Sequence, residues 1–523
     1  MNEGKVIGID LGTTFSEMAW ITPSAVVEII LNLDGDTKTP SIVSWAGAAP
    51  VVGRAARPDL VLAPQHVIQC GKRSMGRTTE EGKPIPIGMG PDGREITAVD
   101  SSAPILSYLK KSAETYLGGE VRRAVVTVPA YFGSRARDDT IAAARIAGFE
   151  EVRLLNEPEA AALHCGLEKQ TNQIIVVVDT GGGTTDVTAI EIIDGTVRTI
   201  HTDGDAELGG ENYSEAMLGL MCKAGKKEGI EISPEKDLPA FYQNFDRARE
   251  AKEMLSRREE VTVIVEAGGK RVPLKLTRKM LRQAAKAFDD RFVACCERLQ
   301  EKLQAQGKTA GRVILVGGNS RQPHIAELVK SVFGVEPAQD TDPDLAIVRG
   351  AAVYAEVCFG RKDTEIVVGG HCYLAEEIRV QTVAAHALCV AARRCKDDPR
   401  EFNCVLVPAG TSLPHEFQER FSPVNPGQRE VTVKIVQGKP EEPSTNASIL
   451  REIRAPIQPS DNDQDRIRVK GRYTAEGLLE LTVVDESSGQ TISDSFIHQP
   501  GLSGTEIEQK RRTLAGPTEG VPS

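Results

Sequence analysis

The chain contains one short pattern twice, and this duplication constrains the fold more than any other feature. Each copy follows a predicted buried strand and consists of an aspartate and a turn of glycine and threonine: D-L-G-T-T at residues 10–14 and D-T-G-G-G-T-T-D at residues 179–186. The copies lie about 170 residues apart, which is too long a period for a stacked-repeat protein. The duplication therefore predicts two similar lobes, each of which presents one turn to a shared cleft.

Residues 1–355 alternate short apolar runs with stretches of helical periodicity. Four runs are predicted to be buried strands, because each is apolar throughout and is followed by Gly, Pro or Asp. They cover residues 6–9, 124–128, 174–178 and 313–316. Strand–helix alternation of this kind predicts the α/β class, with helices packed on mostly parallel sheets.

The composition changes after residue 355. Residues 356–381 contain glycines and charges with little periodicity, so we interpret them as a connector. Residues 382–498 show alternating segments separated by turn signals such as N-P-G at 425–427, which predicts an all-β module, a sandwich. Residues 499–523 are predicted to form one short helix and a flexible tail.

Bulk properties exclude several classes of protein. A length of 523 residues predicts more than one domain, and a net charge of -11 argues against nucleic acid as a partner. No apolar stretch approaches the roughly 20 residues of a membrane span, and the first residues show no signal-peptide pattern. The ten cysteines lack a C-x-x-C spacing, so we expect reduced thiols in a cytoplasmic protein rather than a zinc site.

The two glycine turns carry the clearest chemistry. Backbone N–H groups of such a turn, placed after a strand, point at one spot and bind phosphate oxygens. A single turn of this kind also occurs where no ligand binds, but the pair, each headed by an aspartate, favours phosphate binding. Asp10, Asp179 and Asp186 are placed to hold the water ligands of Mg²⁺, although aspartate also caps ordinary turns.

A third strand–glycine junction lies at residues 315–323, with the sequence L-V-G-G-N-S-R-Q-P. Its small residues let a flat base or ribose approach the backbone, and Arg321 has a planar side chain that can stack on a ring. Alone, the junction is equally compatible with a tight turn before a helix.

These motifs, in this order, resemble the ATPase domain of the seventy-kilodalton heat-shock chaperone family of DnaK type. Further matching strings are T-P-S-I-V at 39–43, G-K-R-S-M-G-R at 71–77, V-T-V-P-A-Y-F at 126–132, A-A-A-R-I-A-G-F at 142–149, N-E-P-E-A-A-A-L at 156–163 and L-G-G-E-N at 208–212. The resemblance implies an actin-like (ribonuclease-H-like) two-lobed fold. Actin and sugar kinases share that fold and the two turns, but lack the N-E-P and V-P-A-Y-F segments.

The resemblance also implies roles for individual residues. Lys72, Glu157 and Asp179 match catalytic positions that place or activate the attacking water. Asp10, Asp179 and Asp186 match the carboxylates around the metal ions, Mg²⁺ and possibly K⁺. Pro129 and Arg137 match a relay between domains. The matches to nucleotide-binding positions are Gly12, Thr13, Thr14, Gly181, Gly182, Gly183, Thr184, Gly209, Gly210, Lys252, Ser256, Gly317, Gly318, Asn319, Arg321 and Asp344.

The chain departs from the family pattern at several positions. Phe15 replaces the Asn or Tyr of the first turn. Arg249 stands where the family has an acid and Glu253 where many members have a base, so a reversed pair at i, i+4 can still form. The connector keeps little of the family's apolar character, and Thr382 stands at the position of its acidic residue. These changes put nucleoside affinity and the coupling between domains in question.

The second module resembles the family's peptide-binding domain at residues 407–414 and 473–490, although a sandwich without a groove is the plainer alternative. Such a module binds extended peptides through backbone hydrogen bonds and an apolar pocket. Residues 501–509 resemble the start of the family's helical lid, but the sequence ends soon after. We therefore expect fast peptide exchange.

Together these features predict an ATPase that acts as an ATP-dependent chaperone for unfolded or extended polypeptides. Two alternatives remain: a nucleotide-binding interaction module with weak hydrolysis, and a metabolite kinase of the same fold. The resemblance further implies a J-domain cochaperone and a nucleotide exchange factor as partners of a monomer, with neither nucleic acid nor membrane involved.

Overall fold

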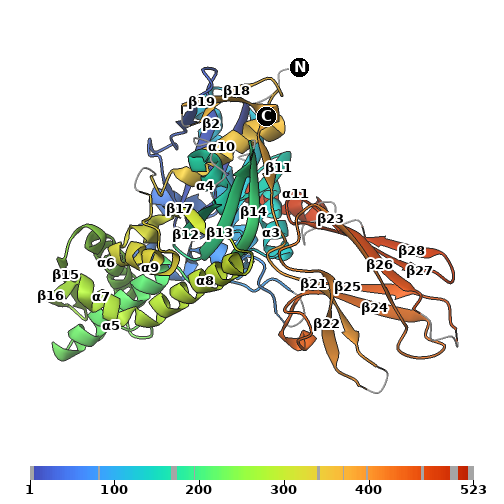
Figure 1. Cartoon of the computed structure of the whole chain (residues 1–523). Coiled ribbons are helices and arrows are strands. Elements are labelled where there is room, and N and C mark those ends of the chain that lie inside the picture. Colours follow the sequence, from blue (N-terminus) through green and yellow to red (C-terminus); the bar gives the residue numbers. More distant parts are fainter. Residues whose placement is uncertain are drawn as a thin grey trace, which may run out of the picture.

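The computed structural model describes residues 5–79, 83–166, 174–193, 195–338, 342–368, 370–395, 398–460, 465–494 and 504–515. A mixed α/β part with several sheets comes first, and a projecting all-β part follows it (Figure 1). Among the described helices, none has the length and apolar character that crossing a lipid bilayer requires.

The first half of the α/β part, residues 5–166, has one six-stranded sheet, in which β4 (Thr39–Pro40) pairs with β2, and two smaller sheets. The strand order of the six-stranded sheet is otherwise β11 (Glu151–Asn156), β10 (Val121–Val128), β1 (Lys5–Asp10), β2 (Phe15–Ile21) and β3 (Val27–Ile29). Strand β1 runs parallel to β10 and antiparallel to β2. Helices α2 (Ala98–Leu117) and α3 (Ser134–Ile146) bury their apolar faces in one cluster with this sheet.

The second half, residues 174–381, repeats the arrangement on a second sheet. The order here is β17 (Ala310–Val316), β12 (Ile174–Thr180), β13 (Thr185–Ile193), β14 (Thr196–Asp205) and β20 (Arg379–Gln381). Strand β12 runs parallel to β17 and antiparallel to β13. In both sheets the duplicated glycine turn is therefore the loop of the hairpin that follows the aspartate, as the sequence pattern predicts.

Two helices fill the space between the sheets. They are α4 (Glu157–Gly166) and α10 (Ala346–Phe359), which pack against each other, α10 also against β1 and α4 against β12. Glycine makes this close packing possible, because a side chain at Gly350 would collide with the backbone of Ala160 and one at Gly8 with the backbone of Ala352.

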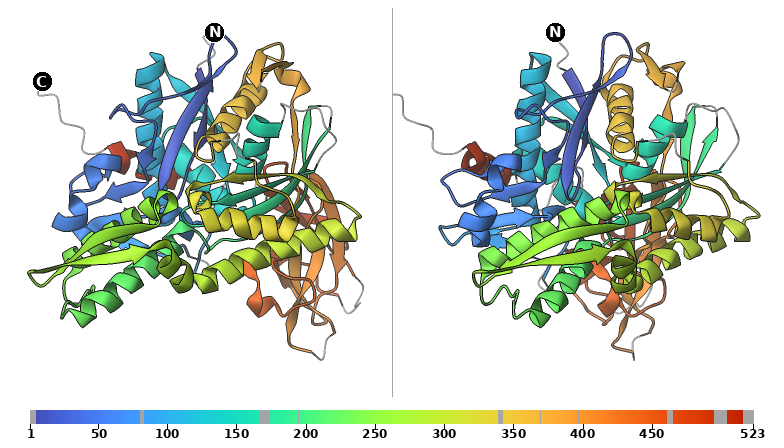
Figure 2. Two further views of the ribbon diagram at one scale, coloured as in Figure 1. Left: turned by 60° about the vertical axis from the view of Figure 1, so that its left-hand side comes forward. Right: turned by 90° about the vertical axis from the view of Figure 1, so that its left-hand side faces the viewer.

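The remaining elements of the second half surround the site on one side. They are α5 (Gly210–Lys227), α6 (Leu238–Arg257), the hairpin of β15 (Glu260–Ala267) and β16 (Lys270–Thr277), α7 (Arg278–Ala284), α8 (Lys286–Ala305) and α9 (Pro323–Phe333). Figure 2 shows α5, α6 and the hairpin, in green, beneath the blue segment of the first half, where α1 (Asp59–Leu62) contacts α6. The two halves thus contact each other in two places, through α4 and α10 between the sheets and through α1 and α6.

Most of the span expected to be a connector is built into the α/β part instead, in contact with both halves. Helix α10 continues to Phe359, β18 (Glu365–Val368) and β19 (His371–Leu374) form a hairpin, and β20 pairs with β14. Buried Ile366, Val368 and Ile378 belong to the same apolar cluster as β12. These strands are three or four residues long, too short to show the alternation that reveals a strand in sequence. The crossing to the next part therefore begins near Thr382.

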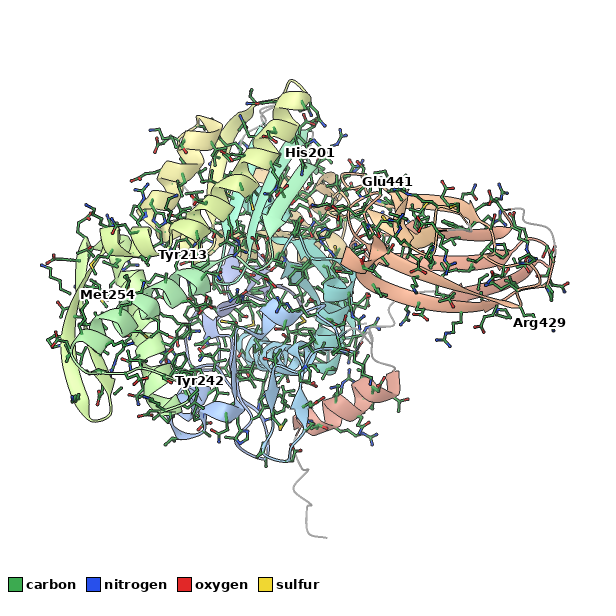
Figure 3. The ribbon with its side chains drawn as sticks, turned by 90° about the horizontal axis from the view of Figure 1, so that it is seen from below. His201, Tyr213, Tyr242, Met254, Arg429 and Glu441 are labelled. Atoms are coloured by element: carbon green, nitrogen blue, oxygen red, sulfur yellow. The ribbon has the colours of Figure 1, made fainter. Side chains whose placement is uncertain are left out.

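The all-β part consists of two four-stranded antiparallel sheets, which we call the β-module. One sheet has the order β22 (Glu401–Val407), β21 (Leu388–Arg393), β24 (Glu430–Gln437) and β25 (Ser448–Pro456). The other has the order β23 (His415–Phe421), β26 (Ile467–Tyr473), β27 (Leu479–Asp485) and β28 (Gln490–Asp494). Inward residues of both sheets form one cluster. The module extends away from the α/β part, with Arg429 at its far end in Figure 3.

The last described helix, α11 (Gly504–Ala515), lies on the first half. Ile507 and Leu514 enter the apolar cluster that contains α2 and α3. The Lys510 Nζ lies 2.5 Å from Asp100 Oδ1, and Arg511 donates a hydrogen bond to the carbonyl oxygen of Arg145. Figure 3 shows this red helix apart from the β-module. The short helix predicted after residue 499 is thus present at 504–515, while residues 516–523 lie outside the described part.

Candidate functional site

A cavity of about 610 Å³ lies between the two halves, and both duplicated turns reach it. The turns are in contact: a side chain at Gly182 would collide with the hydroxyl of Thr14, and one at Gly183 with the side chains of Arg73 and Thr13. Glycine at these positions therefore lets two hairpin loops from different sheets converge.

Most of the residues predicted to bind or act on a ligand line this cavity. The lining set contains Asp10, Gly12, Thr13, Thr14, Lys72, Glu157, Asp179, Gly181, Gly182, Thr184, Gly210, Lys252, Ser256, Gly317, Gly318, Asn319, Arg321 and Asp344. Gly183 and Gly209 lie just behind the wall, where Gly209 packs against the backbone of Gly182. Pro129, Arg137 and Asp186 also lie outside the lining, and the first two follow the end of β10.

Lys72, Asp10, Glu157 and Asp179 line the polar end of the cavity, and a fourth carboxylate, Asp186, lies opposite Asp179 in the β12–β13 hairpin, outside the lining. Lys72 Nζ lies 2.5 Å from Glu157 Oε1, and both side chains are buried. Asp10 accepts a hydrogen bond from Thr127 Oγ1 at 2.8 Å, and Asp186 accepts one from the backbone N–H of Tyr131 at 2.8 Å. The aspartates come from the ends of β1 and β12 and the start of β13, since the hairpins place them there.

The local electrostatics favours added positive charge. Burial, followed by the charge of Glu157, raises the pKa of Asp10 to about 6 and that of Asp186 to about 7. The same two causes raise the pKa of Asp179 well above its ordinary value. Burial acts to lower the pKa of Lys72, but the charges of Glu157 and Asp10 outweigh it and the net shift is upward. The one positive charge of Lys72 therefore does not balance the negative charges of these carboxylates.

The residues present fit a hydrated divalent cation bound together with phosphates. Asp179 Oδ2 and Asn319 Oδ1 are buried acceptors without a hydrogen-bond partner in the structure. Within the described ranges, no group of three or more His, Cys, Asp or Glu side chains is arranged to hold a metal ion. Mg²⁺ characteristically keeps several waters and takes few protein carboxylates, often with substrate phosphates completing its shell. The donor set thus suits Mg²⁺ better than a metal held by protein ligands alone.

The opposite end of the cavity is built on the third glycine junction. Arg321 forms ion pairs with Asp344 at 2.7 Å and Asp342 at 3.0 Å. Asn319 Nδ2 donates to Thr180 Oγ1 at 3.1 Å, which ties this junction to the second turn. Lys252 Nζ donates to the carbonyl oxygen of Gly210 at 3.1 Å. This end offers small residues and a planar guanidinium, as expected for the side that receives a base and ribose.

Arg249 does not pair with Glu253 at i, i+4 in the structure. Arg249 instead binds Glu211 of α5, with Nε and Nη2 3.0 and 2.9 Å from Glu211 Oε2. Its Nη1 donates to Gln69 Oε1 on β7 (Val67–Gln69) of the first half. The guanidinium also pairs with Asp246 on its own helix, with Nη1 3.1 Å from Asp246 Oδ1, so two carboxylates and one amide oxygen share its donors. Arg249 therefore bridges the two halves beside the cavity.

Glu17 and Lys38 are among the lining residues that the sequence analysis missed. Glu17 lies opposite Asp10 in the β1–β2 hairpin, and burial followed by the charge of Asp10 raises its pKa to about 8. Lys38 Nζ lies 2.6 Å from Asp344 Oδ2 and 3.6 Å from Glu17 Oε1. The hairpin register was a usable signal for Glu17, because residues directly opposite in a sheet share a face. The position of Lys38 depends on the assembled fold.

The two residues predicted to relay between domains lie next to the β-module. Pro129 opens the loop between β10 and α3, and Arg137 donates to the carbonyl oxygens of Ala130 and Phe132 in that loop. Arg137 also donates to Asn156 Oδ1 at 2.7 Å and to the carbonyl oxygen of Glu476 in the β-module at 3.2 Å. One buried arginine thus touches the loop, the end of β11 and the module.

Comparison with known proteins gives one consistent result. The family model described as Hsp70 protein matches residues 6–515. The chaperone protein DnaK of Thermotoga neapolitana is 32% identical over 514 residues, which cover 96% of this chain and 82% of that protein. The chaperone protein DnaK of Thermosipho melanesiensis is 31% identical over 516 residues, with the same shares covered. The similarity therefore extends through both the α/β part and the β-module.

Proposed function

This chain belongs to the Hsp70 family and is an ATP-dependent molecular chaperone, and we propose that its α/β part is an actin-like, two-lobed ATPase with the described cavity as its nucleotide site. One observation carries this assignment: turns from two equivalent hairpins meet across a cavity lined by buried carboxylates. The alternatives of a metabolite kinase and of a non-hydrolysing module are not favoured, because the similarity spans both parts of the chain.

The turns are proposed to hold the phosphates and the third junction the nucleoside. Backbone N–H groups of Gly12 to Thr14 and Gly181 to Thr184 bind phosphate oxygens, and the threonine hydroxyls add donors. Arg321 and Lys252 lie at the end of the cavity that receives the base and ribose. The nucleotide then bridges both halves, so its binding holds the cleft closed.

Asp10, Asp179 and Asp186 would hold Mg²⁺ through its water ligands, and the same carboxylates would hold K⁺. The metal supplies charge neutralisation on the transferring phosphate. Lys72, fixed by its ion pair with Glu157, is positioned to stabilise negative charge as it develops on the γ-phosphate. Asp179, whose raised pKa and free oxygen suit proton acceptance, orients the attacking water.

The β-module is the proposed binding site for unfolded or extended polypeptides. An extended segment is expected to bind by backbone hydrogen bonds and an apolar pocket. Thr382 Oγ1 accepts a hydrogen bond from Asn156 Nδ2 at 2.8 Å, which links the start of the module to the residue before Glu157. This contact supports coupling in spite of the altered connector. A J-domain cochaperone and a nucleotide exchange factor complete the proposed cycle.

The test is peptide stimulation of ATP hydrolysis by the full chain, repeated with Lys72→Ala. We expect an unfolded peptide to accelerate hydrolysis by the wild type, and Lys72→Ala to hydrolyse roughly 100-fold more slowly while it still binds ATP. Lys110→Ala is a matched control, since Lys110 pairs with Glu114 on α2 outside the cavity. Wild-type chain that shows no Mg²⁺-dependent hydrolysis, or an Ala variant as fast as wild type, would contradict the assignment.

A further inference from the structure

Tyr131 in the loop after β10 uses both of its peptide groups in contacts between distant parts of the chain. Its N–H donates to Asp186 Oδ1 at 2.8 Å, and its carbonyl oxygen lies 2.8 Å from Nε2 of His386. His386 stands just before β21, at the start of the β-module. A single residue therefore separates a side chain of the module from a carboxylate at the phosphate end of the cavity.

The contact between His386 and Tyr131 is specific in geometry. A carbonyl oxygen only accepts hydrogen bonds, so the Nε2 of His386 carries the proton in this arrangement. The two rings also meet edge to face, with centroids 4.3 Å apart and planes at 68°. Edge-to-face pairs of this kind are favourable beyond their buried area. The imidazole is thus held by a directional bond and a ring contact at once.

Other module residues meet this region further along the chain. Gln437 and Tyr473 contact Ser134 at the start of α3, and Glu476 contacts Arg137 one turn later. Those contacts hold the module on α3. Only the contact of His386, among those of the described residues, falls on the residue whose N–H binds Asp186.

We propose that His386 is a positioning residue: through Tyr131 it sets where the Asp186 carboxylate lies, and so ties docking of the β-module to the rate of ATP hydrolysis. This inference rests on the proposed nucleotide site. When the module moves away, Tyr131 loses the donor at its carbonyl oxygen, so one of the contacts that fix the backbone next to its N–H donor to Asp186 is gone. Asp186 then no longer holds the phosphate end in one arrangement.

Two variants of the full chain separate this role from general packing. His386→Gln keeps an N–H donor at nearly the same place without the ring, whereas His386→Phe keeps the ring and removes the donor. The measurement is the fold-stimulation of single-turnover ATP hydrolysis by an unfolded peptide, with ATP affinity measured in parallel. We expect the fold-stimulation of His386→Phe to be at least fivefold smaller than that of the wild type, with ATP affinity within twofold of wild type. His386→Gln should retain most of the stimulation.

Every other outcome would contradict the proposed positioning role of His386. Wild-type stimulation in the Phe variant would show that the bond to Tyr131 does not matter, and equal losses in both variants would show that only packing does. Retention by Phe together with loss by Gln would assign the effect to the ring instead. A wild-type chain that lacks the peptide response would contradict the proposed function itself, so the two failures are distinguishable.

Discussion

Lys72 and Glu157 form an ion pair of 2.5 Å in which each side chain is only 6% exposed. Both charges have left water, so the pair is maintained by its geometry and by the surrounding charges rather than by solvent. Asp10, Asp179 and Asp186 lie close enough for Glu157 to raise the pKa of each. The cleft thus stores unfavourable carboxylate repulsion that a cation can relieve, and the first prediction follows from this.

Without Mg²⁺, the chain should become less stable as pH rises from about 4 to about 7. The folded pKa values of Asp10 and Asp186 are about 6 and about 7, above the ordinary 3.8. The folded state therefore holds these protons more tightly than the unfolded chain, and the free energy of unfolding falls as they are lost. Urea denaturation in EDTA at about pH 5 and about pH 8 measures the effect, and Mg²⁺ with ADP should restore stability at the higher pH.

The matched variants for this experiment are Asp186→Asn and Asp290→Asn. The first removes one of the raised carboxyl groups and should reduce the fall in stability, whereas the second changes an exposed residue of α8 and should leave it intact. If stability without Mg²⁺ falls equally in wild type and Asp186→Asn, the Asp186 carboxyl group is not a source of the fall.

Arg249→Ala should accelerate release of ADP. Arg249 of α6 binds Glu211 on its own half and Gln69 on the other, so it closes the cleft beside the nucleotide. A hydrogen bond to a charged group contributes roughly 1.5 to 3 kcal/mol, which corresponds to roughly ten- to a hundredfold in rate. Stopped-flow release of a fluorescent ADP analogue gives the rate. Arg247→Ala, a neighbour on the same helix that pairs with Glu266, should change release less than about twofold.

Two glycines in helices should respond to alanine in opposite ways. At Gly350 in α10 the added methyl group collides with the backbone of Ala160 in α4, which cannot move as a side chain would. We expect a loss of about 1 to 3 kcal/mol or more in the free energy of unfolding. At Gly219 in α5 the methyl group meets nothing within 4 Å, so helix propensity should stabilise by about 0.5 to 1 kcal/mol. Chemical denaturation of the pair compares them, and equal effects would show that α4 and α10 are not in close contact.

Local sequence patterns were sufficient for the two glycine turns, their aspartates and the α/β class, because each depends on residues adjacent in the chain, whereas Lys72, Glu157 and Lys252 were identified through the family resemblance. A glycine turn after an apolar strand can be recognised from the local sequence, and the aspartate next to it is recognised at the same time. Residues 356–381 were misjudged because the strands within them are too short to show a period. The hydrogen bond from Arg249 to Gln69 and the ion pairs of Lys38 join residues far apart in sequence, so no local sequence pattern predicts them.

Release of bound peptide should be fast and should not depend on α11. The helix resembles the start of a lid in sequence, yet it packs on α3 through Ile507 and Leu514 and pairs with Asp100 of α2. In this position it does not cover the β-module, so the barrier to peptide escape lies in the module itself. A chain that ends after Asp494 should therefore release a labelled peptide within about twofold of the full chain's rate in stopped-flow measurements with ATP. A chain that ends after Ala515 keeps α11 and serves as the control. Release that is slow in the control and at least tenfold faster without α11 would show that the helix leaves α3 and covers the bound peptide.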